Sequence, residues 1–306
     1  MHALRCQITL KNYYKFVNYD NNWYNHLMAT ILDGKKLRDK ILAELKTKLD
    51  GFAKKPTLVV ILVGDNPASQ IYVNNKKKTA EKLGINSVVI NYPKTVTEKE
   101  LLAKIEELNN DKEVTAILVQ LPLPEHISKE NVMNTISPQK DVDGFTPYNF
   151  GKLFSGEEPI VYPCTPKGVL LLLDEYNIEL DGKQAVVIGR SNIVGRPMSQ
   201  MLLNRNATVT VCHSHTKNLA DIIKTADIVV SAVGKNIIEG EMLKPGCVIV
   251  DVGIFKDENG KTRGDANFES ASKTASYISP VPGGVGPMTI TSLMLNTVEL
   301  FEKSST

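Results

Sequence analysis

Tyr72 and Lys76 lie four residues apart, a spacing that puts both side chains on the same face of a helix. An aromatic ring beside an ammonium group can stack on a flat heterocycle while the amine reaches its reactive edge. The pair therefore indicates a site for a planar substrate. The alternative is a solvated lysine that lies over a packed tyrosine.

Gln120 ends the apolar segment 115–119 and is followed by Leu121-Pro122-Leu123-Pro124, which must stop a strand. Open α/β sheets bind ligands at the carboxyl ends of their strands, so we expect the Gln120 amide at a ligand site. The alternative is an amide that only caps the strand end.

Asp141 and Asp143 fall in a Pro-rich and Gly-rich passage that we interpret as the hinge between two domains. Alternate residues of an extended segment face opposite ways, so only one of these carboxylates is expected to enter a cleft. There it could accept paired hydrogen bonds from a pterin or a guanidinium. Ordinary turn or cap chemistry is the competing explanation.

Residues 184–197 run from an apolar strand through a glycine-framed turn into a helix, which is typical of a Rossmann unit that binds a pyrophosphate. Gly189 allows the tight turn and Gly195 allows close packing of helix on strand. We expect the helix N-terminus to offer free N–H groups to the phosphates. Ser191 and Val194 replace the second and third glycines of the G-x-G-x-x-G pattern, and Gly195 comes one residue late.

The next strand, 207–212, ends about 20 residues after the turn, where NAD sites carry an Asp or Glu for the ribose hydroxyl. The chain has His213 and Ser214 there instead, while Arg190 lies in the turn. These residues favour NADP, with Arg190 as the partner of the 2′-phosphate. The alternative is a solvated arginine beside an ordinary βα turn.

The composition is that of a globular chain: 306 residues, 42% hydrophobic, 23% charged, with a net charge of +2. The charge forms no basic block, which argues against nucleic acid or a membrane surface as a partner. The scattered Cys6, Cys164, Cys212 and Cys247 suit reduced thiols in a cytoplasm. No metal site is expected, because His213 and His215 alternate beside Cys212 at a strand end.

The first 27 residues are rich in Asn and Tyr and have no apolar signal region, so we interpret 1–27 as a leader or upstream extension without stable structure. A transit peptide is disfavoured, because the segment has only Arg5, Lys11 and Lys15 as basic residues and no serine.

Beyond Met28, strands and helices alternate. Leu37, Ile41, Leu45 and Leu49 predict an amphipathic helix capped by Asp33. Further helices are expected to end at Gly84 and to open with the capping box Thr97-x-x-Glu100. The strands that we predict in the first half are 57–63, 87–92 and 115–120.

This rhythm predicts an α/β fold of two domains with parallel sheets and a cleft between them. The substrate domain covers 28–147 together with the C-terminal segment 287–306, and the Rossmann domain covers 148–286. The segment Gly283-Gly284-Val285-Gly286 could approach a ligand closely or be a plain linker. After it, a last helix at about 289–303, with Thr289 as its cap, is expected to pack back on the first domain.

Several motifs together resemble the bifunctional methylenetetrahydrofolate dehydrogenase/cyclohydrolase family from about Met28 to the C-terminus. The motifs are Tyr72-x-x-x-Lys76, Val119-Gln-Leu-Pro-Leu-Pro, Lys140-Asp-Val-Asp-Gly-Phe, Gly189-Arg-Ser-Asn-Ile-Val-Gly-Arg-Pro and Pro280-Val-Pro-Gly-Gly-Val-Gly-Pro-Met-Thr.

The resemblance implies a homodimeric cleft enzyme that oxidises methylenetetrahydrofolate with NADP and then hydrolyses the methenyl product to 10-formyltetrahydrofolate. It implies that Lys76 is the main catalytic residue, that Tyr72 stacks on the substrate, that Gln120 holds the lysine and that Asp143 anchors the pterin. Leu121, Pro282, Gly283 and Gly284 complete the predicted folate site. The predicted cofactor residues are Gly189, Arg190, Ser191, Val194, Gly195, His213, Ser214, Val233, Gly234, Val252 and Gly253.

Two other functions stay open at this point. One is an NADP-dependent dehydrogenase of another small substrate, similar to shikimate dehydrogenase, and the other is a dinucleotide-sensing module without turnover. A dehydrogenase of another small substrate does not explain the Gln-Leu-Pro-Leu-Pro and Pro-Gly-Gly-Val-Gly-Pro segments. The second needs no convergence of Lys76, Gln120 and Asp143.

Overall fold

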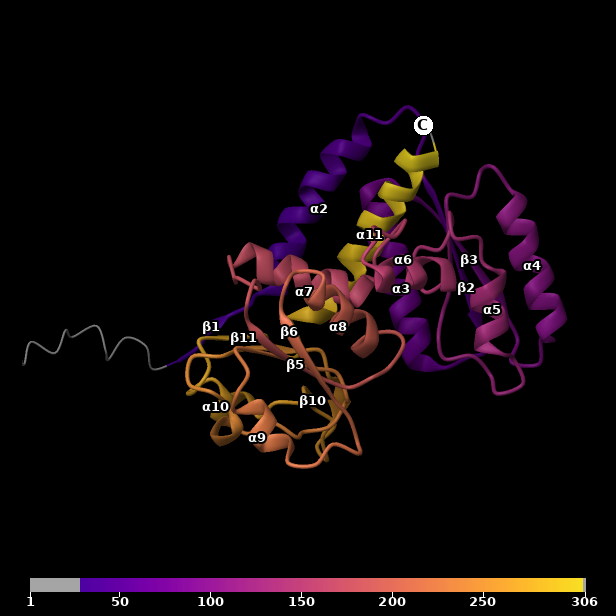
Figure 1. The fold of residues 1–306 in the computed structure, drawn as a ribbon. Helices are drawn as coiled ribbons and strands as arrows, with labels where there is room; N and C mark the ends of the chain where they lie inside the picture. Colours follow the sequence, from indigo (N-terminus) through magenta and orange to yellow (C-terminus); the bar gives the residue numbers. More distant parts are fainter. Residues whose placement is uncertain (1–27, 305–306) are drawn as a thin grey trace, which may run out of the picture.

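The protein is described here by a computed structural model that covers residues 28–304. A small and a large parallel sheet, each flanked by helices, form two neighbouring α/β units (Figure 1). The predicted leader 1–27 lies outside the described residues. Within them, no helix is both long and apolar enough to cross a membrane.

The small sheet has the strand order β3-β2-β4 and is parallel throughout. Its strands are β2 (Thr57–Val63), β3 (Asn86–Tyr92) and β4 (Ala116–Val119), close to the predicted ranges. The helices around it are α2 (Gly34–Asp50), α3 (Pro67–Leu83), α4 (Glu98–Asn110) and α5 (Lys129–Thr135).

The helix ends follow the predicted signals. The Asp33 carboxylate caps α2 by accepting from the Lys36 N–H, and α3 ends at Gly84, which has a φ of 83°. Both hydrogen bonds of the capping box between Thr97 and Glu100 are present at the start of α4. The turn at Gly84 fixes where α3 ends, and the Asn66 side chain caps its start by accepting from the Ser69 N–H. This helix carries Tyr72 and Lys76.

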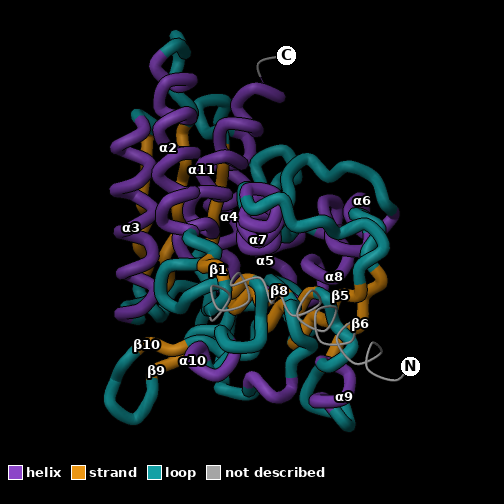
Figure 2. The backbone as a smooth tube through the Cα atoms, turned by 90° about the vertical axis from the view of Figure 1, so that its left-hand side faces the viewer, coloured by secondary structure: helices purple, strands orange, loops and turns teal. Residues whose placement is uncertain are grey.

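Burial on both faces explains the continuous apolar run of β2. Leu58, Val60 and Leu62 pack in the cluster with α2, α3 and the last helix α11 (Val285–Ser304), which run side by side in Figure 2. Val59, Ile61 and Val63 point to the opposite face of the sheet, where they pack against α4. A strand covered on both faces carries no polar alternation, as expected in a parallel sheet.

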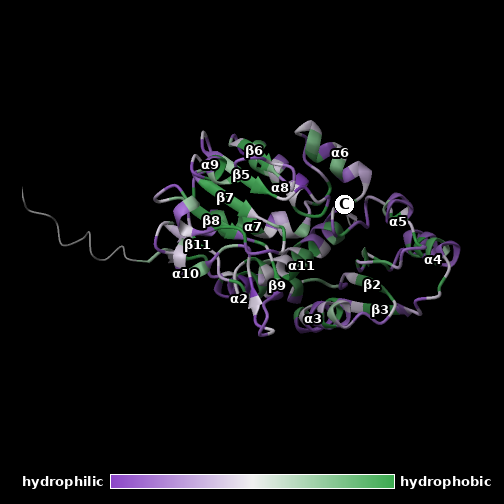
Figure 3. Ribbon diagram, turned by 90° about the horizontal axis from the view of Figure 1, so that it is seen from below, coloured by the Kyte–Doolittle hydropathy of each residue, from purple (hydrophilic) through white to green (hydrophobic). Residues whose placement is uncertain are grey.

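The large sheet has the order β1-β11-β8-β7-β5-β6, again parallel, and its strands are strongly apolar (Figure 3). The strands are β1 (Thr30–Ile31), β5 (Gln184–Ile188), β6 (Thr208–Cys212), β7 (Ile228–Ser231), β8 (Val248–Asp251) and β11 (Tyr277–Ile278). β6 lies on one side of β5 and β7 on the other, so the order of winding switches between β5 and β7, the usual place for a ligand.

The remaining elements connect and cover these strands. They are α6 (Pro147–Ser155), α7 (Cys164–Glu175), α8 (Gly195–Leu203), α9 (Leu219–Ile223), the 3-10 helix η2 (Gly240–Met242), α10 (Phe268–Ala271) and an antiparallel pair of β9 (Phe255–Lys256) and β10 (Thr262–Arg263).

Two segments depart from the expected organisation. Thr30 and Ile31, assigned to the substrate domain 28–147, pair instead with Tyr277 and Ile278 in the large sheet. The last helix begins at Val285 rather than near Thr289, so Thr289 lies inside the helix and is not its cap. This helix contacts α2, α3 and β4 as well as α7, and thus joins the two units.

Candidate active site

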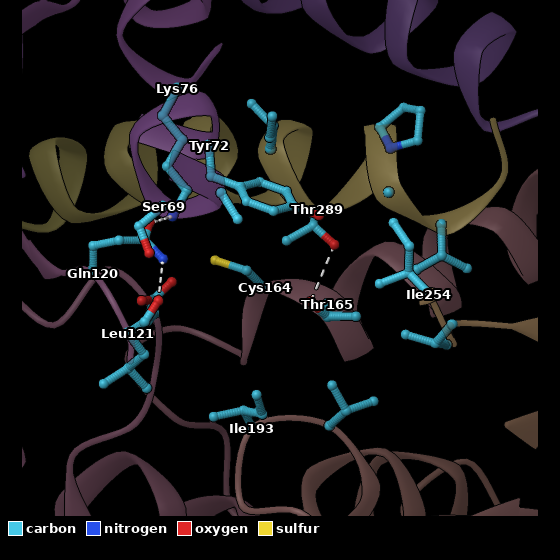
Figure 4. Close-up of a pocket in the computed structure, with 18 of the residues that line it drawn as sticks. Ser69, Tyr72, Lys76, Gln120, Leu121, Cys164, Thr165, Ile193, Ile254 and Thr289 are labelled. Atoms are coloured by element: carbon cyan, nitrogen blue, oxygen red, sulfur yellow. Dashed lines mark hydrogen bonds between the residues drawn. The ribbon is translucent and has the colours of Figure 1, made fainter. Parts of the chain in front are cut away.

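A cavity of about 620 Å³ lies between the two units (Figure 4). Its walls come from α3 and the chain after β4 on one side, and from the chain after β5 and β8 on the other. The carboxyl ends of strands from both sheets therefore border one space, which is where parallel sheets present ligand-binding residues.

Lys76, Tyr72 and Gln120 meet in this cavity, as the sequence predicted. The Lys76 side chain is only 9% exposed, and its Nζ donates to Oε1 of Gln120 over 2.9 Å. Gln120 Nε2 in turn donates to the Leu121 carbonyl over 2.7 Å. Tyr72 is 45% exposed, and its side chain lies near Lys76 at the cavity (Figure 4). This environment differs from that of a solvated surface lysine.

The two hinge carboxylates are separated as expected. Asp141 is buried and accepts hydrogen bonds from the Thr146 N–H (2.8 Å) and from Asn149 Nδ2 (2.9 Å), so it holds the start of α6. Asp143 lines the cavity. Burial raises the pKa of the Asp143 carboxyl, while the positive charge of Lys76 opposes this rise. The charge of Lys76 thus reaches the Asp143 carboxyl at the same cavity.

Pro282 and Gly283 line the same cavity, whereas the predicted Gly284 lies outside its lining, and the segment is held by the start of α2. The Lys35 N–H donates to the Gly283 carbonyl over 3.2 Å. Gly34 lies so close to Gly284 that a Cβ at residue 34 would overlap the Gly284 carbonyl. The glycine-rich segment is therefore fixed against a helix and is not a plain linker.

The glycine turn after β5 has the expected backbone. Gly189 has a φ of 116°, and a Cβ there would lie 2.8 Å from the Ala232 carbonyl oxygen. A Cβ on Gly195 would overlap the Gly189 backbone, so α8 packs directly on the strand end. Both positions require glycine for the reasons that the sequence predicted.

The expected free N–H groups at the start of α8 need correction. The Ser191 Oγ accepts hydrogen bonds from the N–H groups of Val194 (3.2 Å) and Gly195 (3.4 Å). The helix also begins at Gly195, several residues after the strand ends, so a turn of several residues separates the strand from the helix. A hydroxyl therefore already caps amides that we expected to be available to a phosphate.

Arg190 and Ser214 are exposed, and His213 lies half-buried next to them at the end of β6. Partial burial lowers the pKa of His213, and the nearby positive charge of Arg190 lowers it further. The predicted partners of a 2′-phosphate therefore share one polar, positively charged corner of the large sheet.

The other predicted cofactor residues follow the ends of β7 and β8. Val252 and Gly253 line the cavity with Lys76, whereas Val233 and Gly234 follow β7 at the same edge of the sheet, outside the cavity lining. Of the turn residues, Val194 reaches the cavity, and Gly189, Arg190 and Ser191 lie outside its lining. The predicted cofactor residues thus extend from the cavity along the strand ends.

Sequence reasoning missed several residues that line the cavity. Cys164 and Thr165 enter it from the start of α7, and Thr165 shares a 3.1 Å hydrogen bond between hydroxyl oxygens with Thr289 of α11 (Figure 4). Ile193 and Ile254 add apolar walls from the cofactor side. Ile193 belongs to the recognised turn motif, so its position could have been foreseen; nothing local marks the others.

The sequence model of the tetrahydrofolate dehydrogenase/cyclohydrolase catalytic domain matches residues 32–143. That of the NAD(P)-binding domain of the same family matches residues 163–305. The chain belongs to the tetrahydrofolate dehydrogenase/cyclohydrolase family. It is therefore an α/β protein with a catalytic and an NAD(P)-binding domain, as the sequence motifs predicted.

Individual relatives agree with this assignment. The bifunctional protein FolD of Ligilactobacillus salivarius is 54% identical over 282 residues, which cover 91% of this chain and 99% of the relative. The crystal structure of the bifunctional FolD methylenetetrahydrofolate dehydrogenase/cyclohydrolase from Campylobacter jejuni is 52% identical, with a TM-score of 0.88 over 90% of this chain and 99% of that one. The FolD structure from Trypanosoma brucei, complexed with NADP and an inhibitor, is 38% identical, with a TM-score of 0.87 over 91% and 99% of the two chains.

Proposed function

We propose that this protein oxidises 5,10-methylenetetrahydrofolate with NADP and hydrolyses the resulting 5,10-methenyltetrahydrofolate to 10-formyltetrahydrofolate. The observation that carries the proposal is that Lys76, Tyr72 and Asp143 open into the same cavity as Val252 and Gly253 from the cofactor side. One carbon atom held in this cavity can face a hydride acceptor and an amine together. Both reactions then need only one bound orientation of the substrate.

The folate site is formed by side chains with complementary roles. The exposed Tyr72 ring offers a flat face on which the ring system can stack. Asp143 accepts hydrogen bonds from the pterin N–H groups, which stabilise its ionised form against the effect of burial. Gln120 and Leu121 fix the amine and the adjacent wall. Pro282 and Gly283 close the site, while Gly284 lies against Gly34 outside the cavity lining.

The cofactor side fits an NADP molecule. Gly189 and Gly195 keep Cβ atoms away from the turn after β5, and Arg190, His213 and Ser214 offer a positive, polar corner for the 2′-phosphate. NADP, when bound, supplies the acceptor for the hydride. Val252 and Gly253 border the cavity and hold the reacting end near the folate, while Ile193 and Ile254 exclude water from this wall.

Hydrolysis of the methenyl product depends on Lys76. Water adds to the methenyl carbon, the bond from that carbon to N5 breaks, N5 takes up one of the two water protons, and the other proton is released. The Lys76 Nζ is held by Gln120 inside the cavity, where it can orient the water or pass a proton. Because the folate nitrogens stabilise the cation, the hydride step itself requires positioning more than a base.

The test is incubation of the protein with methylenetetrahydrofolate and NADP. NADPH formation, transient methenyl absorbance and its decay are all expected. NADPH formation only with shikimate-like substrates would instead assign a dehydrogenase of another small molecule. NADP binding without turnover of any of these substrates would instead indicate a dinucleotide-sensing module.

We also propose a homodimer and a cytoplasmic location. The edge strand β3 supports the dimer, because it pairs only with β2 among the described strands and its Val88 is 45% exposed. The buried free thiols Cys164, Cys212 and Cys247 support a reducing compartment. Light scattering of the purified protein and of a Val88→Lys variant tests the dimer. A dimer mass for both proteins would place the interface elsewhere, and a monomer mass for both would exclude the dimer.

A further inference from the structure

Two carboxylates, Asp251 and Asp265, are buried under the loops on the cofactor side, with exposures of 3% and 0%. Asp251 is the last residue of β8, and Asp265 follows β10. The two are connected because the Asp265 N–H donates to Asp251 Oδ1 over 2.9 Å. Neither belongs to the residues that sequence motifs predicted for the cofactor.

Asp265 holds the chain that follows β7. Its Oδ2 accepts hydrogen bonds from the Val233 N–H (2.8 Å) and from Ser231 Oγ (2.7 Å), and its Oδ1 accepts from the Lys235 N–H (2.8 Å). Two backbone amides of the chain after β7 and one hydroxyl at the end of β7 thus converge on one carboxylate. The shape of this loop depends on a residue distant in sequence.

Asp265 also sets the chain that follows β8. A Cβ on Gly253 would overlap the Asp265 carboxylate, so Gly253 rests directly on it. Asp251 holds the same residue from the other side, because its Oδ1 accepts from the Gly253 N–H over 3.0 Å. Gly253 and its neighbour Val252 line the cavity that contains Lys76.

The chemistry of these contacts requires a carboxylate at residue 265. An ionised carboxylate only accepts hydrogen bonds, and all of the groups above that meet Asp265 are donors. An asparagine of the same shape would direct its NH₂ group at the Val233 N–H in one orientation and at the Lys235 N–H in the other. Because a buried donor without an acceptor is costly, the loop would shift to relieve it.

We propose that Asp265 is a positioning residue for the dinucleotide: through the loops after β7 and β8 it fixes the surface that receives the reacting end of NADP. The inference rests on the proposed function for the identity of the ligand. It assigns no contact between Asp265 and either substrate. The folate side, formed by α3 and the chain after β4, lies across the cavity from these loops.

The experiment compares wild type with Asp265→Asn by NADP calorimetry, by the KM for NADP in the dehydrogenase reaction, and by hydrolysis of methenyltetrahydrofolate without dinucleotide. We expect the Kd and KM for NADP to rise about tenfold or more, with hydrolysis within about twofold of wild type. Unchanged NADP affinity in the folded variant, or an equal loss of hydrolysis, would overturn the proposal.

Asp227→Asn is the matched control. Asp227 also accepts from a backbone N–H of the large sheet, that of Gln184 at 2.9 Å, but at the amino end of β5. The Asp227→Asn variant should have a lower thermal stability than wild type and an unchanged affinity for NADP. If Asp265→Asn does not fold, Ser231→Ala removes one donor to Oδ2 and should give a smaller loss in NADP affinity alone; no loss would again refute the role of Asp265.

Calorimetry separates this inference from the proposed function. A wild type that binds NADP without turning over folate would refute the function but would still allow the variant to be tested. A wild type that turns over folate, with an Asp265→Asn variant of equal NADP affinity, would refute only the inference.

Discussion

Lys76 and Gln120 come from different elements, α3 and the chain after β4, yet a 2.9 Å hydrogen bond joins the lysine amine to the glutamine Oε1. The second polar atom of Gln120 is occupied by the Leu121 carbonyl, so the amide cannot turn without losing both contacts. The amine is therefore held inside the cavity by the end of a strand. An amine with this restraint can act on one defined atom of a substrate.

Replacing Lys76 with Met should abolish the hydrolysis of methenyltetrahydrofolate, while folate and NADP still bind. The variant keeps an unbranched apolar chain as far as Cε but has no amine to orient water or carry a proton, and such groups contribute roughly 10² to 10⁴ in rate. Loss of methenyl absorbance measures the reaction, and calorimetry measures binding.

Lys77→Met is the matched control, because Lys77 is 45% exposed and pairs with Glu81 on the surface of α3. Its hydrolysis rate should equal that of wild type. Undiminished hydrolysis by Lys76→Met would remove Lys76 from the mechanism.

Replacing Arg190 with Ala should weaken NADP far more than NAD. The loss of a charge-assisted contact to the 2′-phosphate costs roughly 2 to 3 kcal/mol, or about 30-fold to 150-fold in Kd. Kd values for both dinucleotides, measured at the same ionic strength, give the ratio. Arg205→Ala is the control, since Arg205 pairs with Asp174 on α7; equal losses of NADP and NAD in Arg190→Ala would mean that Arg190 does not contact the phosphate.

Local signals in the sequence predicted the strands β2 to β6, the helix ends at Asp33, Gly84 and Thr97, and the cavity residues Tyr72, Lys76, Gln120 and Asp143. The same signals failed where one residue type is typical of two different local structures. Pro287 comes before the predicted start of the last helix at about residue 289, whereas the structure places it in the first turn of α11, where proline has no hydrogen bond to lose. The true helix start was therefore missed, and Thr289 was wrongly assigned as a cap.

Contacts between distant segments could not be predicted from one sequence. The strand β1 is two residues long, too short for any periodicity, and pairs with β11 near the other end of the chain. Asp265 shows no motif, and its role emerges only when Ser231, Val233 and Lys235 surround it. Such arrangements depend on packing rather than on local preference.

Replacing Gly34 with Ala should weaken folate binding, because the new methyl group would overlap the Gly284 carbonyl and displace the Pro282 to Gly284 segment. A displacement of this size at a binding wall raises the KM for methenyltetrahydrofolate by about tenfold to a hundredfold. The NADP Kd should stay near that of wild type. Steady-state hydrolysis and calorimetry give the two values.

Gly151→Ala provides the control for Gly34→Ala. A Cβ at residue 151, inside α6, meets no atom within 4 Å, and alanine is the better helix former. This variant should have wild-type KM values and equal or slightly higher stability. An unchanged folate KM in Gly34→Ala would show that the glycine-rich segment does not contact the substrate.

Asp251 should make the stability of the protein depend on pH. Burial raises the pKa of its carboxyl to about 7, against the hydrogen bonds from the N–H groups of Ala266 and Asp265, which lower it. In the unfolded chain the same carboxyl titrates near its usual value of about 3.9. Between these two values the folded protein binds the extra proton, so this group contributes stability at acidic pH that is lost as the pH rises to about 7.

The measurement is urea unfolding of wild type and of Asp251→Asn at pH 5 and pH 8. The variant cannot titrate at this position, so the difference between the two proteins isolates Asp251 from the other groups. Wild type should be more stable relative to the variant at pH 5 than at pH 8, by at most roughly 3 kcal/mol, which is the linkage limit for about two pH units. A difference that is the same at both pH values would mean that Asp251 is ionised in the folded protein throughout this range.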